Sequence, residues 1–509
     1  MKLAGLVGDL ALRANGVRAF ALPEADGVRA FALPEADANV TGFAIDHRKV
    51  APGTVFGAFP GTRFNGEDFI PAAIAAGAVA VVARPGVRVE GAIHLAADEP
   101  RQLFAQIAAR FFTPVPATVV AVTGTNGKTS TVEMTRQIWR MAGHRSASIG
   151  TLGVTTADES ISTGLTTPDI VTFLANVSGL AREGISHLAY EASSHGLDQY
   201  RNEGLPVAAG AFTNLSRDHL DYHPSMEAYF AAKMRLFDEV VIDGGTAVVW
   251  ADDGWSARAI EHARARGLTL LTVGEAGETI RLTGRTPTLL GQTLELEHAG
   301  RMRTLTLPLI GAYQAANALV SAGLVLATGG DPDRTFEALA RLQPVRGRLE
   351  RAAINAAGAP VYVDYAHTPD ALTAACDALR PHVAGNGGGR LILVFGAGGD
   401  RDPGKRAPMG AAASAGADIV IVTDDNPRGE DPAAIRAEVI AGCDTACDNA
   451  ARELGDRRAA IAAAIAEAGA GDIVLIAGKG HEQGQIVGRG DAIRILPFDD
   501  VVVARECTA

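Results

Sequence analysis

Residues 119–142 combine an apolar strand, a glycine-rich turn and a helix, and this order constrains the fold more than any other stretch. The β-branched run at 119–122 predicts a buried strand, and Thr-Gly-Thr-Asn-Gly-Lys-Thr-Ser follows at 123–130. Residues 131–142 are compatible with a helix. Backbone N–H groups and a helix N-terminus then surround one point, which favours an anion site.

The side chains of this loop indicate a nucleotide phosphate as the anion. Lys128 offers a mobile positive charge, and Thr129 or Ser130 offers a hydroxyl for Mg²⁺. The usual phosphate loop has a glycine where this chain has Val122, so the loop is a shortened variant. An ordinary tight turn is the alternative, but Gly-Lys-Thr directly after a strand disfavours it. The residues predicted to bind ATP here are Gly124, Thr125, Asn126, Gly127, Lys128, Thr129 and Ser130.

Length and charge limit the classes of protein. A chain of 509 residues predicts two to four domains, and a net charge of −12 argues against nucleic-acid binding. No run of about 18 uncharged apolar residues occurs, so we expect no membrane span. The N-terminus lacks the pattern of a signal peptide, and the four cysteines show no metal-like pairing. We therefore expect a cytoplasmic protein.

Apolar strands alternate with helical runs, which predicts an α/β fold. We expect domains at residues 1–113, 114–345 and 346–509, with a hinge at Pro114 and Pro116. Strands at 361–364, 390–395, 419–423 and 473–477 favour a doubly wound third domain. An 11-residue segment at 16–26 is repeated without change at 27–37. Two copies are too few for a solenoid, so we expect one copy to form a surface loop.

Three polar clusters follow in the second predicted domain. Thr166 and Thr167 precede a proline and either cap a helix or present hydroxyls to a substrate. Residues 190–201 follow a strand, where Glu191 suits Mg²⁺, and residues 214–223 follow another. The histidines of 214–223 lack zinc-ligand spacing, so we discount zinc. By periodicity alone Lys233 is a solvated surface lysine.

Three more clusters, at 396–402, 423–428 and 478–482, each follow a predicted strand of the third domain. The carboxyl ends of these strands should meet in one crevice that holds Arg401, Asp425, Arg428 and Glu482. Arginine pairs with carboxylates through two hydrogen bonds, and a carboxylate pairs with an amine. The mixture predicts a ligand that carries both amino and carboxylate groups.

Taken together, these motifs resemble those of the Mur ligase family over residues 44–500. The phosphate loop is joined by Glu-Ala-Ser-Ser-His (191–195), Thr-Asn-Leu-Ser-Arg-Asp-His-Leu-Asp-Tyr-His (213–223), Asp-Tyr-Ala-His-Thr-Pro-Asp (364–370), Gly-Gly-Asp-Arg-Asp (398–402), Asp-Asn-Pro-Arg (425–428) and Ala-Gly-Lys-Gly-His-Glu (477–482). The resemblance implies a small α/β UDP-binding domain, a central ATPase-like domain and a C-terminal Rossmann-like domain.

The resemblance also assigns roles by position. It implies that Lys128, Glu191, Lys233 and His219 are catalytic, with Lys233 carbamylated, and that Thr129, Glu191 and the Lys233 carbamate hold magnesium. Asn317 and Arg348 match nucleotide-binding positions, and His367 lies in a neighbouring motif. The residues implied to bind the UDP-substrate are Ile45, His47, Thr166, Thr167, Ser193, Gln199 and Arg201. The residues implied to bind the added amino acid are Arg401, Asp425, Asn426, Pro427, Arg428, Gly478 and Glu482.

The implied reaction uses ATP and Mg²⁺ to join meso-diaminopimelate to UDP-N-acetylmuramoyl-L-alanyl-D-glutamate through an acyl phosphate. Arg428 should select diaminopimelate, because the family's lysine-adding members typically replace this arginine. At the uridine the family usually has Asp-Ser-Arg, whereas this chain has Asp46-His47-Arg48. A lysine-adding ligase, a folylpolyglutamate synthetase-type ligase and an inactive nucleotide-binding scaffold are the alternatives. We expect a monomer, and His367 is a candidate base for the attacking amine.

Overall fold

The computed structural model describes residues 1–8, 21–24, 27–30, 38–61, 64–161, 166–220, 222–288, 290–384, 388–443 and 451–508. The chain divides into two compact units. The first comprises Met1–Lys128, Gly143–Val248 and Gly254–Leu270, and the second comprises Thr129–Ala142, Val249–Asp253 and Leu271–Ala509.

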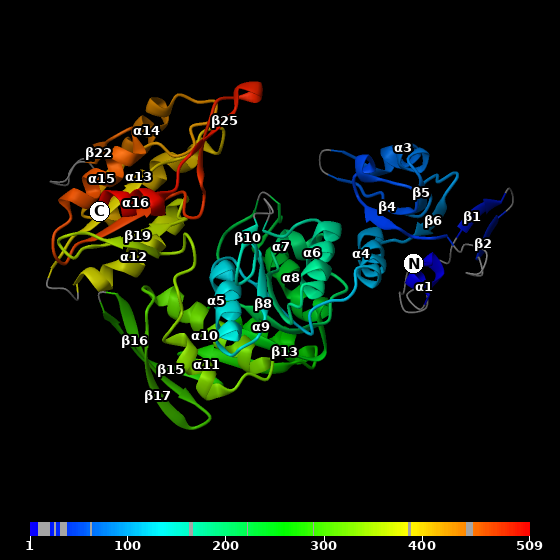
Figure 1. Ribbon diagram of the computed structural model, residues 1–509, viewed down its shortest axis with the longest axis horizontal. Helices are drawn as coiled ribbons and strands as arrows, with labels where there is room; N and C mark the ends of the chain where they lie inside the picture. The colour runs from blue at the N-terminus through cyan, green and yellow to red at the C-terminus, as the bar shows by residue number, and fades with distance from the viewer. Residues whose placement is uncertain are drawn as a thin grey trace. The chain divides into compact units, whose positions relative to one another are not determined.

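The first unit opens with a small parallel sheet (Figure 1). Its strands lie in the order β3 (Gly42–Ala44), β4 (Thr54–Gly57), β5 (Ala78–Ala83) and β6 (Ile93–Ala96). Its helices are α1 (Leu3–Val7), η2 (His47–Lys49), η3 (Gly66–Phe69), α3 (Ile70–Ala75) and α4 (Pro100–Phe111). Buried Phe56, Ile70 and Val81 belong to one core on this sheet. These elements match the alternation expected from the sequence.

The phosphate-loop strand lies inside a larger sheet of the first unit. The strand order is β10 (Ser160–Ile161), β9 (Gly153–Thr155), β8 (Ser146–Gly150), β11 (His187–Glu191), β7 (Thr118–Thr123), β12 (Val207–Phe212) and β13 (Val241–Trp250). Strand β7 pairs in parallel with β11 and β12, so Val119 to Val122 are fully buried. The helices here are α6 (Ile170–Arg182), α7 (Ser194–Asp198), α8 (Met226–Arg235), η4 (Leu236–Val240) and α9 (Ser256–Ala265).

The second unit contains helix α5 from its second residue onward (Lys128–Met141) and a series of strands. Strand β14 (Thr269–Gly274) pairs in parallel with β15 (Ile280–Thr288). Strands β16 (Gly291–His298) and β17 (Arg301–Leu307) continue as an antiparallel meander. Helices α10 (Ala312–Ala327) and α11 (Pro332–Leu339) follow.

The last sheet carries its apolar side chains alternately on its two faces. Its order is β18 (Glu350–Ile354), β19 (Pro360–Asp364), β23 (Ile473–Ala477), β20 (Leu391–Phe395), β21 (Ile419–Val422) and β22 (Arg452–Glu453). Leu391, Leu393 and Phe395 belong to one core, whereas Ile392 and Val394 belong to the other. Both faces are therefore buried, as in doubly wound sheets.

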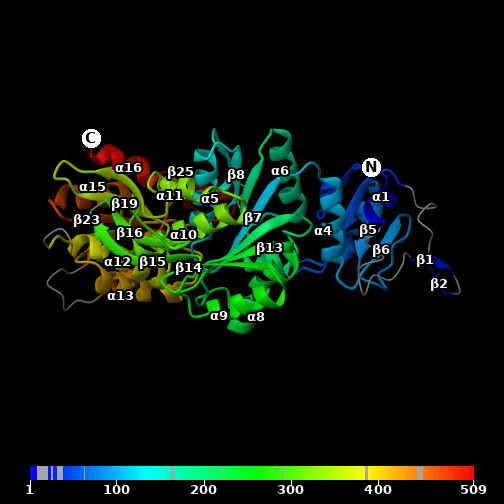
Figure 2. The same ribbon diagram turned by 90° about the horizontal axis from the view of Figure 1, so that it is seen from below.

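Helices and a short hairpin complete this region (Figure 2). They are α12 (Pro369–Ala384), η5 (Pro403–Lys405), α13 (Arg406–Gly416), α14 (Pro432–Ile440), α15 (Arg457–Glu467), β24 (Gly484–Val487), η6 (Gly490–Ala492), β25 (Arg494–Pro497) and α16 (Asp500–Thr508). All its strands except β18 run parallel to their neighbours in the sheet, so their carboxyl ends share one edge. The expected α/β class is confirmed, while the three domain boundaries stay a prediction.

The exact repeat near the N-terminus is described only in part. Strand β1 (Ala21–Glu24) comes from the first copy and pairs antiparallel with β2 (Gly27–Ala30) from the second. The rest of the duplicated segment, and Cys447, lie outside the described residues, so the surface-loop expectation stays a prediction. Within the described part of the chain, no helix combines the length and apolar character needed to cross a membrane.

Candidate active site

The glycine loop after β7 is held in a conformation that only glycine accepts at its first position. Gly124 has φ +146°, and a Cβ atom there would lie 1.9 Å from Thr213 Oγ1. The N–H of Thr125 donates to the carbonyl of Asn214 at 2.9 Å, and the N–H of Asn126 donates to Asn214 Oδ1 at 2.9 Å. The segment after β12 therefore braces the loop.

Two lysines converge on this loop. Lys128 Nζ donates to the carbonyls of Gly124 at 3.0 Å and Thr125 at 2.8 Å. Lys233 Nζ donates to the same Gly124 carbonyl at 2.7 Å and lies 4.3 Å from the centre of the Tyr229 ring. Burial, and then the charge of Lys128, hold the pKa of Lys233 well below its usual value.

The prediction that Lys233 is a solvated lysine is wrong, because only 1% of it is exposed. It lies on the buried face of α8, and its neighbours Tyr229, Phe230 and Met234 are also buried. Apolar residues three and four positions before it, with another directly after it, are a helical pattern that could have indicated burial.

Glu191 ends β11 and is almost fully buried. Its Oε1 accepts from the Thr151 N–H at 2.7 Å and its Oε2 from the Thr151 hydroxyl at 3.3 Å. A Cβ on Gly150 would lie 2.1 Å from Glu191 Oε1, so the carboxylate lies directly against the end of β8. The structure thus fixes this carboxylate at a strand end, as predicted.

The hydroxyls around Glu191 form one connected group. Thr167 Oγ1 donates to the Glu191 carbonyl at 3.1 Å and lies 2.9 Å from Ser193 Oγ, while Thr166 Oγ1 lies 3.0 Å from Thr151 Oγ1. Neither threonine caps the next helix. Asp169 caps α6, because its side chain accepts from the N–H groups of residues 171 and 172. The cap alternative for Thr166 and Thr167 is therefore wrong.

Arg201 joins this group to the rest of the predicted UDP-substrate site. Its guanidinium donates to the Thr167 carbonyl at 3.0 Å and to Gln199 Oε1 at 2.6 Å. Gln199 in turn donates to the Tyr222 hydroxyl at 3.0 Å. His219 has φ +52°, a strained backbone for this residue type, and packs against the His195 ring at 4.9 Å.

In the small sheet, Ile45 follows β3 and is half-buried, and His47 begins η2. The His47 ring stacks on Phe69 with centroids 4.4 Å apart and planes 2° apart. Hydrogen bonds from the Arg48 guanidinium lower the pKa of Asp46 to about 2, so this carboxylate stays ionised. The histidine that replaces the family's usual serine thus extends a flat ring over Phe69.

Asn317 and Arg348 lie in the second unit. Asn317 is buried in α10 and donates to Gln314 Oε1 at 3.3 Å, and Gln314 donates to the Arg348 carbonyl at 2.8 Å. The Arg348 guanidinium lies 4.8 Å from the centre of the Tyr365 ring. His367 Nδ1 lies 2.8 Å from the Tyr365 carbonyl, and burial lowers the pKa of this histidine. One Gln side chain therefore joins both predicted nucleotide positions.

The Asp-Asn-Pro-Arg segment follows β21 and has a constrained backbone. Arg428 has φ +50°, its N–H donates to the Ile486 carbonyl at 3.0 Å, and its carbonyl accepts from Gly488 at 2.7 Å. Its guanidinium donates to the Gly399 carbonyl at 2.8 Å. Strand β24 and the loop after β20 therefore hold Arg428 from two sides. Pro427 lies between Asn426 and Arg428 and is buried.

The loop after β23 meets the same segment. Gly478 has φ +113°, and a Cβ there would lie 3.1 Å from Asp425 Oδ2. Glu482 Oε2 accepts from Asn426 Nδ2 at 2.9 Å. Lys479 Nζ also contacts both loops, and sequence analysis did not single it out. The structure therefore brings Asp425, Asn426, Arg428, Gly478 and Glu482 together, whereas Arg401 is exposed nearby in the loop after β20.

The predicted magnesium ligands are Thr129, Glu191 and a carbamate on Lys233. Thr129 begins the second unit with a buried side chain, and Glu191 and Lys233 belong to the first unit. Among the described residues, no cluster of three or more His, Cys, Asp or Glu side chains is arranged to hold a metal ion. An amine is a poor Mg²⁺ ligand, whereas a carbamate supplies the oxygen atoms that this ion prefers.

Three family models match the chain. They are the Mur ligase family catalytic domain at residues 39–112, the Mur ligase middle domain at 122–325 and the Mur ligase glutamate ligase domain at 347–480. With the phosphate loop, the buried lysine and the polar cluster around Arg428, these matches define the class of protein. The chain belongs to the Mur ligase family.

Two relatives are similar to this chain over most of its length. A UDP-N-acetylmuramoyl-L-alanyl-D-glutamate–2,6-diaminopimelate ligase of Zymomonas mobilis is 62% identical over 467 residues, covering 92% of this chain and 94% of the relative. The enzyme of the same name from Bradyrhizobium diazoefficiens is 53% identical over 468 residues, covering 91% and 93%.

Solved structures with a similar fold include those of two enzymes. A structure of a ligase of that name matches with a TM-score of 0.71 and 34% identity, covering 96% of this chain and 97% of that one. A folylpolyglutamate synthase of Mycobacterium tuberculosis matches with a TM-score of 0.56 and 20% identity, covering 73% and 89%. The second match shows a shared fold alone.

Proposed function

We propose that this protein is an ATP-dependent ligase that adds meso-diaminopimelate to UDP-N-acetylmuramoyl-L-alanyl-D-glutamate, a step of peptidoglycan precursor synthesis. The γ-phosphate of ATP moves to the γ-carboxylate of the D-glutamyl residue and gives an acyl phosphate. A free amine of diaminopimelate then attacks the carbonyl carbon, the amide bond forms, and inorganic phosphate leaves. The glycine loop binds ATP, and the polar cluster around Arg428 binds the amino acid.

The observation that carries this proposal is the polar cluster around Arg428. Asp425, Arg428 and Glu482 place carboxylates and a guanidinium at one sheet edge, which suits a substrate with both amines and carboxylates. Diaminopimelate has a second carboxylate that L-lysine lacks, and Arg428 supplies a donor fork for it. The retained arginine therefore favours diaminopimelate over the lysine alternative.

Most of the catalytic effect then comes from positioning and charge neutralisation, as in other phosphoryl transfers. Lys128 pairs with the phosphates, and the backbone N–H groups of the loop surround them. Mg²⁺, held by Thr129, Glu191 and a carbamate on Lys233, would neutralise phosphate charge. His219, whose ring packs against that of His195, is a further catalytic candidate, and His367 is the candidate base.

The environment of Lys233 supports its carbamylation. Only a neutral amine adds to CO₂, and burial lowers the pKa of this lysine, which increases the share of the neutral form. The nitrogen forms a bond to carbon, and its proton passes to solvent. We expect activity to fall in CO₂-depleted buffer and to return when bicarbonate is added, whereas Lys233→Arg should not respond. Unchanged activity after CO₂ removal would exclude the carbamate.

The decisive experiment supplies ATP and the UDP-muramoyl-dipeptide with either meso-diaminopimelate or L-lysine. We expect phosphate release and a UDP-tripeptide product with diaminopimelate alone. Lys128→Ala, which removes the loop cation, should abolish both signals. Release with lysine alone would reassign the substrate, and no release with either amino acid would favour a nucleotide-binding scaffold. We further propose that the enzyme is cytoplasmic and monomeric. Size-exclusion chromatography with light scattering would test the monomeric state.

A further inference from the structure

Lys479 is a lysine without solvent exposure in the loop that follows β23. It lies between Gly478 at φ +113° and Gly480 at φ +55°. A Cβ on Gly480 would lie 2.7 Å from Tyr365 Cβ, so the backbone here passes too close to its neighbour for any other residue. Burying an ammonium group is costly unless it is paired, so its partners must compensate for that cost.

All three directions of the Lys479 ammonium lead to protein oxygens. Nζ donates to Asn426 Oδ1 at 2.9 Å and to the Gly484 carbonyl at 2.8 Å, and it forms an ion pair with Asp425 Oδ1 at 3.1 Å. An ammonium group has three N–H donors. Two of these donors are used in hydrogen bonds, and the ammonium group has no solvent exposure, so any effect on the reaction must pass through the residues that it holds.

The first of these residues is Asn426, whose amide orientation is decided by its donors. Asn426 Oδ1 accepts from Lys479 Nζ and from the Ile486 N–H, both at 2.9 Å. Since both partners are donors, the atom that faces them must be the amide oxygen. The amide nitrogen then faces Glu482 and donates to its Oε2 at 2.9 Å. Lys479 thus helps to fix the Glu482 carboxylate through Asn426, and its Nζ also lies 3.9 Å from Glu482 Oε2 in an ion pair.

The second residue is Asp425, which is buried beside Lys479. Among the described residues Asp425 Oδ1 has no hydrogen-bond partner, so its contact with Lys479 is ionic and it stays available as an acceptor. Other cations act here as well, since Lys405 and Arg457 interact electrostatically with Asp425. Losing Lys479 would make this cluster more negative by one unit of charge. Excess negative charge repels the second carboxylate of diaminopimelate and has no such effect on L-lysine.

We propose that Lys479 is a positioning residue that orients Asp425, Asn426 and, through Asn426, Glu482 for the incoming amino acid, and that its charge favours diaminopimelate over L-lysine. This inference rests on the proposed function and assigns a specificity role to a residue of the same cluster.

The test compares Lys479→Met, which keeps the length of the side chain without its charge, with Lys479→Arg, which keeps the charge in a different shape. In Lys479→Met we expect the KM for diaminopimelate to rise on the order of 10- to 100-fold, as for the loss of a hydrogen bond to a charged group. The KM for ATP should stay near the wild-type value. The preference for diaminopimelate over L-lysine, measured as the ratio of kcat/KM values, should fall. Lys479→Arg should retain more of this preference, although its KM for diaminopimelate also rises.

The matched control is Arg458→Met, which removes an exposed cation from the same domain, where it pairs with Glu506. It should leave every kinetic parameter unchanged. Equal rises of both KM values in Lys479→Met, or no rise, would overturn the inference. If Lys479→Met does not fold, Lys479→Arg decides, and an unchanged KM for diaminopimelate in that variant overturns the inference. No turnover of diaminopimelate by the wild-type enzyme would instead refute the proposed function.

Discussion

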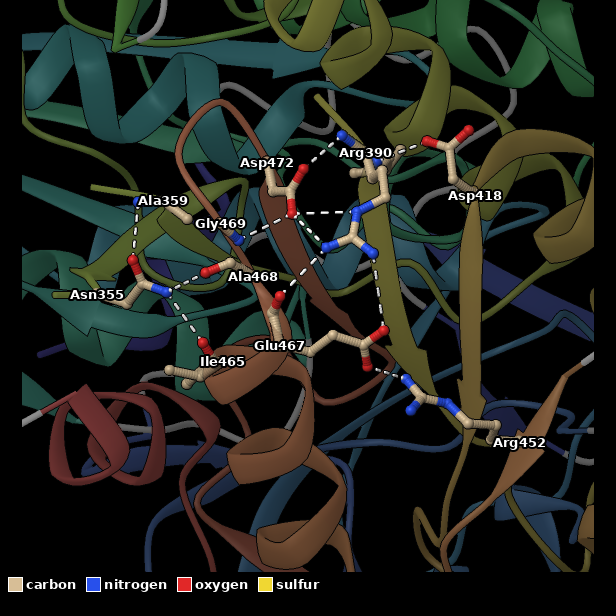
Figure 3. Close-up of polar contacts among 11 residues, drawn as sticks. Asn355, Ala359, Arg390, Asp418, Arg452, Ile465, Glu467, Ala468, Gly469 and Asp472 are labelled. Atoms are coloured by element: carbon tan, nitrogen blue, oxygen red, sulfur yellow. Dashed lines mark hydrogen bonds and ion pairs between the residues drawn. The ribbon is translucent and has the colours of Figure 1, made fainter. Parts of the chain in front are cut away.

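The two ends of the last sheet use polar residues in opposite ways. At the carboxyl ends of its strands, Asp400 and Arg428 have positive φ angles, and Asp425 Oδ1 is buried without a hydrogen-bond partner among the described residues. At the amino ends, Asn355 and Asp472 use both polar atoms of their side chains in contacts with the protein (Figure 3). The carboxyl end thus has positive φ angles and an acceptor without a hydrogen bond, whereas Asn355 and Asp472 at the amino end use their polar atoms within the protein.

The difference separates binding from stability within one domain. Asn355 donates to the carbonyls of Ile465 and Ala468 and accepts from the N–H groups of residues 357 and 359. Asp472 accepts from the backbone N–H and the guanidinium of Arg390. Acceptors that are satisfied internally cannot bind a ligand, whereas unsatisfied ones are costly unless a ligand pairs with them. We therefore expect changes at the two ends to affect different measurements.

The largest effect should come from Asn355→Ala at the amino end. It removes four hydrogen bonds to the backbone, so the free energy of unfolding should fall by about 3 kcal/mol. Urea denaturation measures the change, and the KM for diaminopimelate should not move. A large rise of that KM in a folded variant would contradict the separation of stability at the amino end from binding at the carboxyl end.

Arg428→Ala at the carboxyl end should weaken binding of the amino acid and leave stability unchanged. Losing the guanidinium should raise the KM for diaminopimelate about 30-fold, or about 2 kcal/mol. The KM for ATP and the urea midpoint should stay close to those of the wild-type enzyme. Equal increases in both KM values would contradict its role in binding the amino acid.

Asp472→Asn should cost about 1 kcal/mol of stability near neutral pH. Burial acts to raise the pKa of Asp472, but hydrogen bonds from Arg390 and Gly469 outweigh it, and the pKa lies below its usual value of 3.8. A lowered pKa contributes stability above pH 3.8, and this contribution disappears as the pH falls through the folded-state pKa. The difference between wild type and variant in urea midpoint should therefore shrink below about pH 4. A difference that is constant with pH would exclude this ion pair as its source.

Arg452→Ala should have the smallest effect. Arg452 pairs with Glu467 at the same end, but 45% of the arginine side chain is exposed. Exposed ion pairs contribute less than about 1 kcal/mol, so unfolding and both KM values should change little. A loss as large as that of Asn355→Ala would show that exposure is a poor guide to the importance of a residue in this network.

Local sequence patterns were sufficient to predict the helices and strands and to locate the loops that carry the candidate functional residues. The strand, glycine turn and helix around residue 124 follow from spacing, because each element has its own period of apolar residues and glycine alone accepts the turn. The positions of Glu191 and Asp425 follow as well, since polar residues after apolar strands fall at the carboxyl edge of a parallel sheet. Motif resemblance added the roles of Lys233 and Arg428.

The sequence by itself thus determined the α/β class, the order of elements and the strand ends that carry polar groups. Only the tertiary structure decided that Lys233 donates to the phosphate loop and that Lys479 joins two loops. These facts depend on contacts between segments far apart in the chain. The pairing of a charge comes from such contacts, and no local period encodes it.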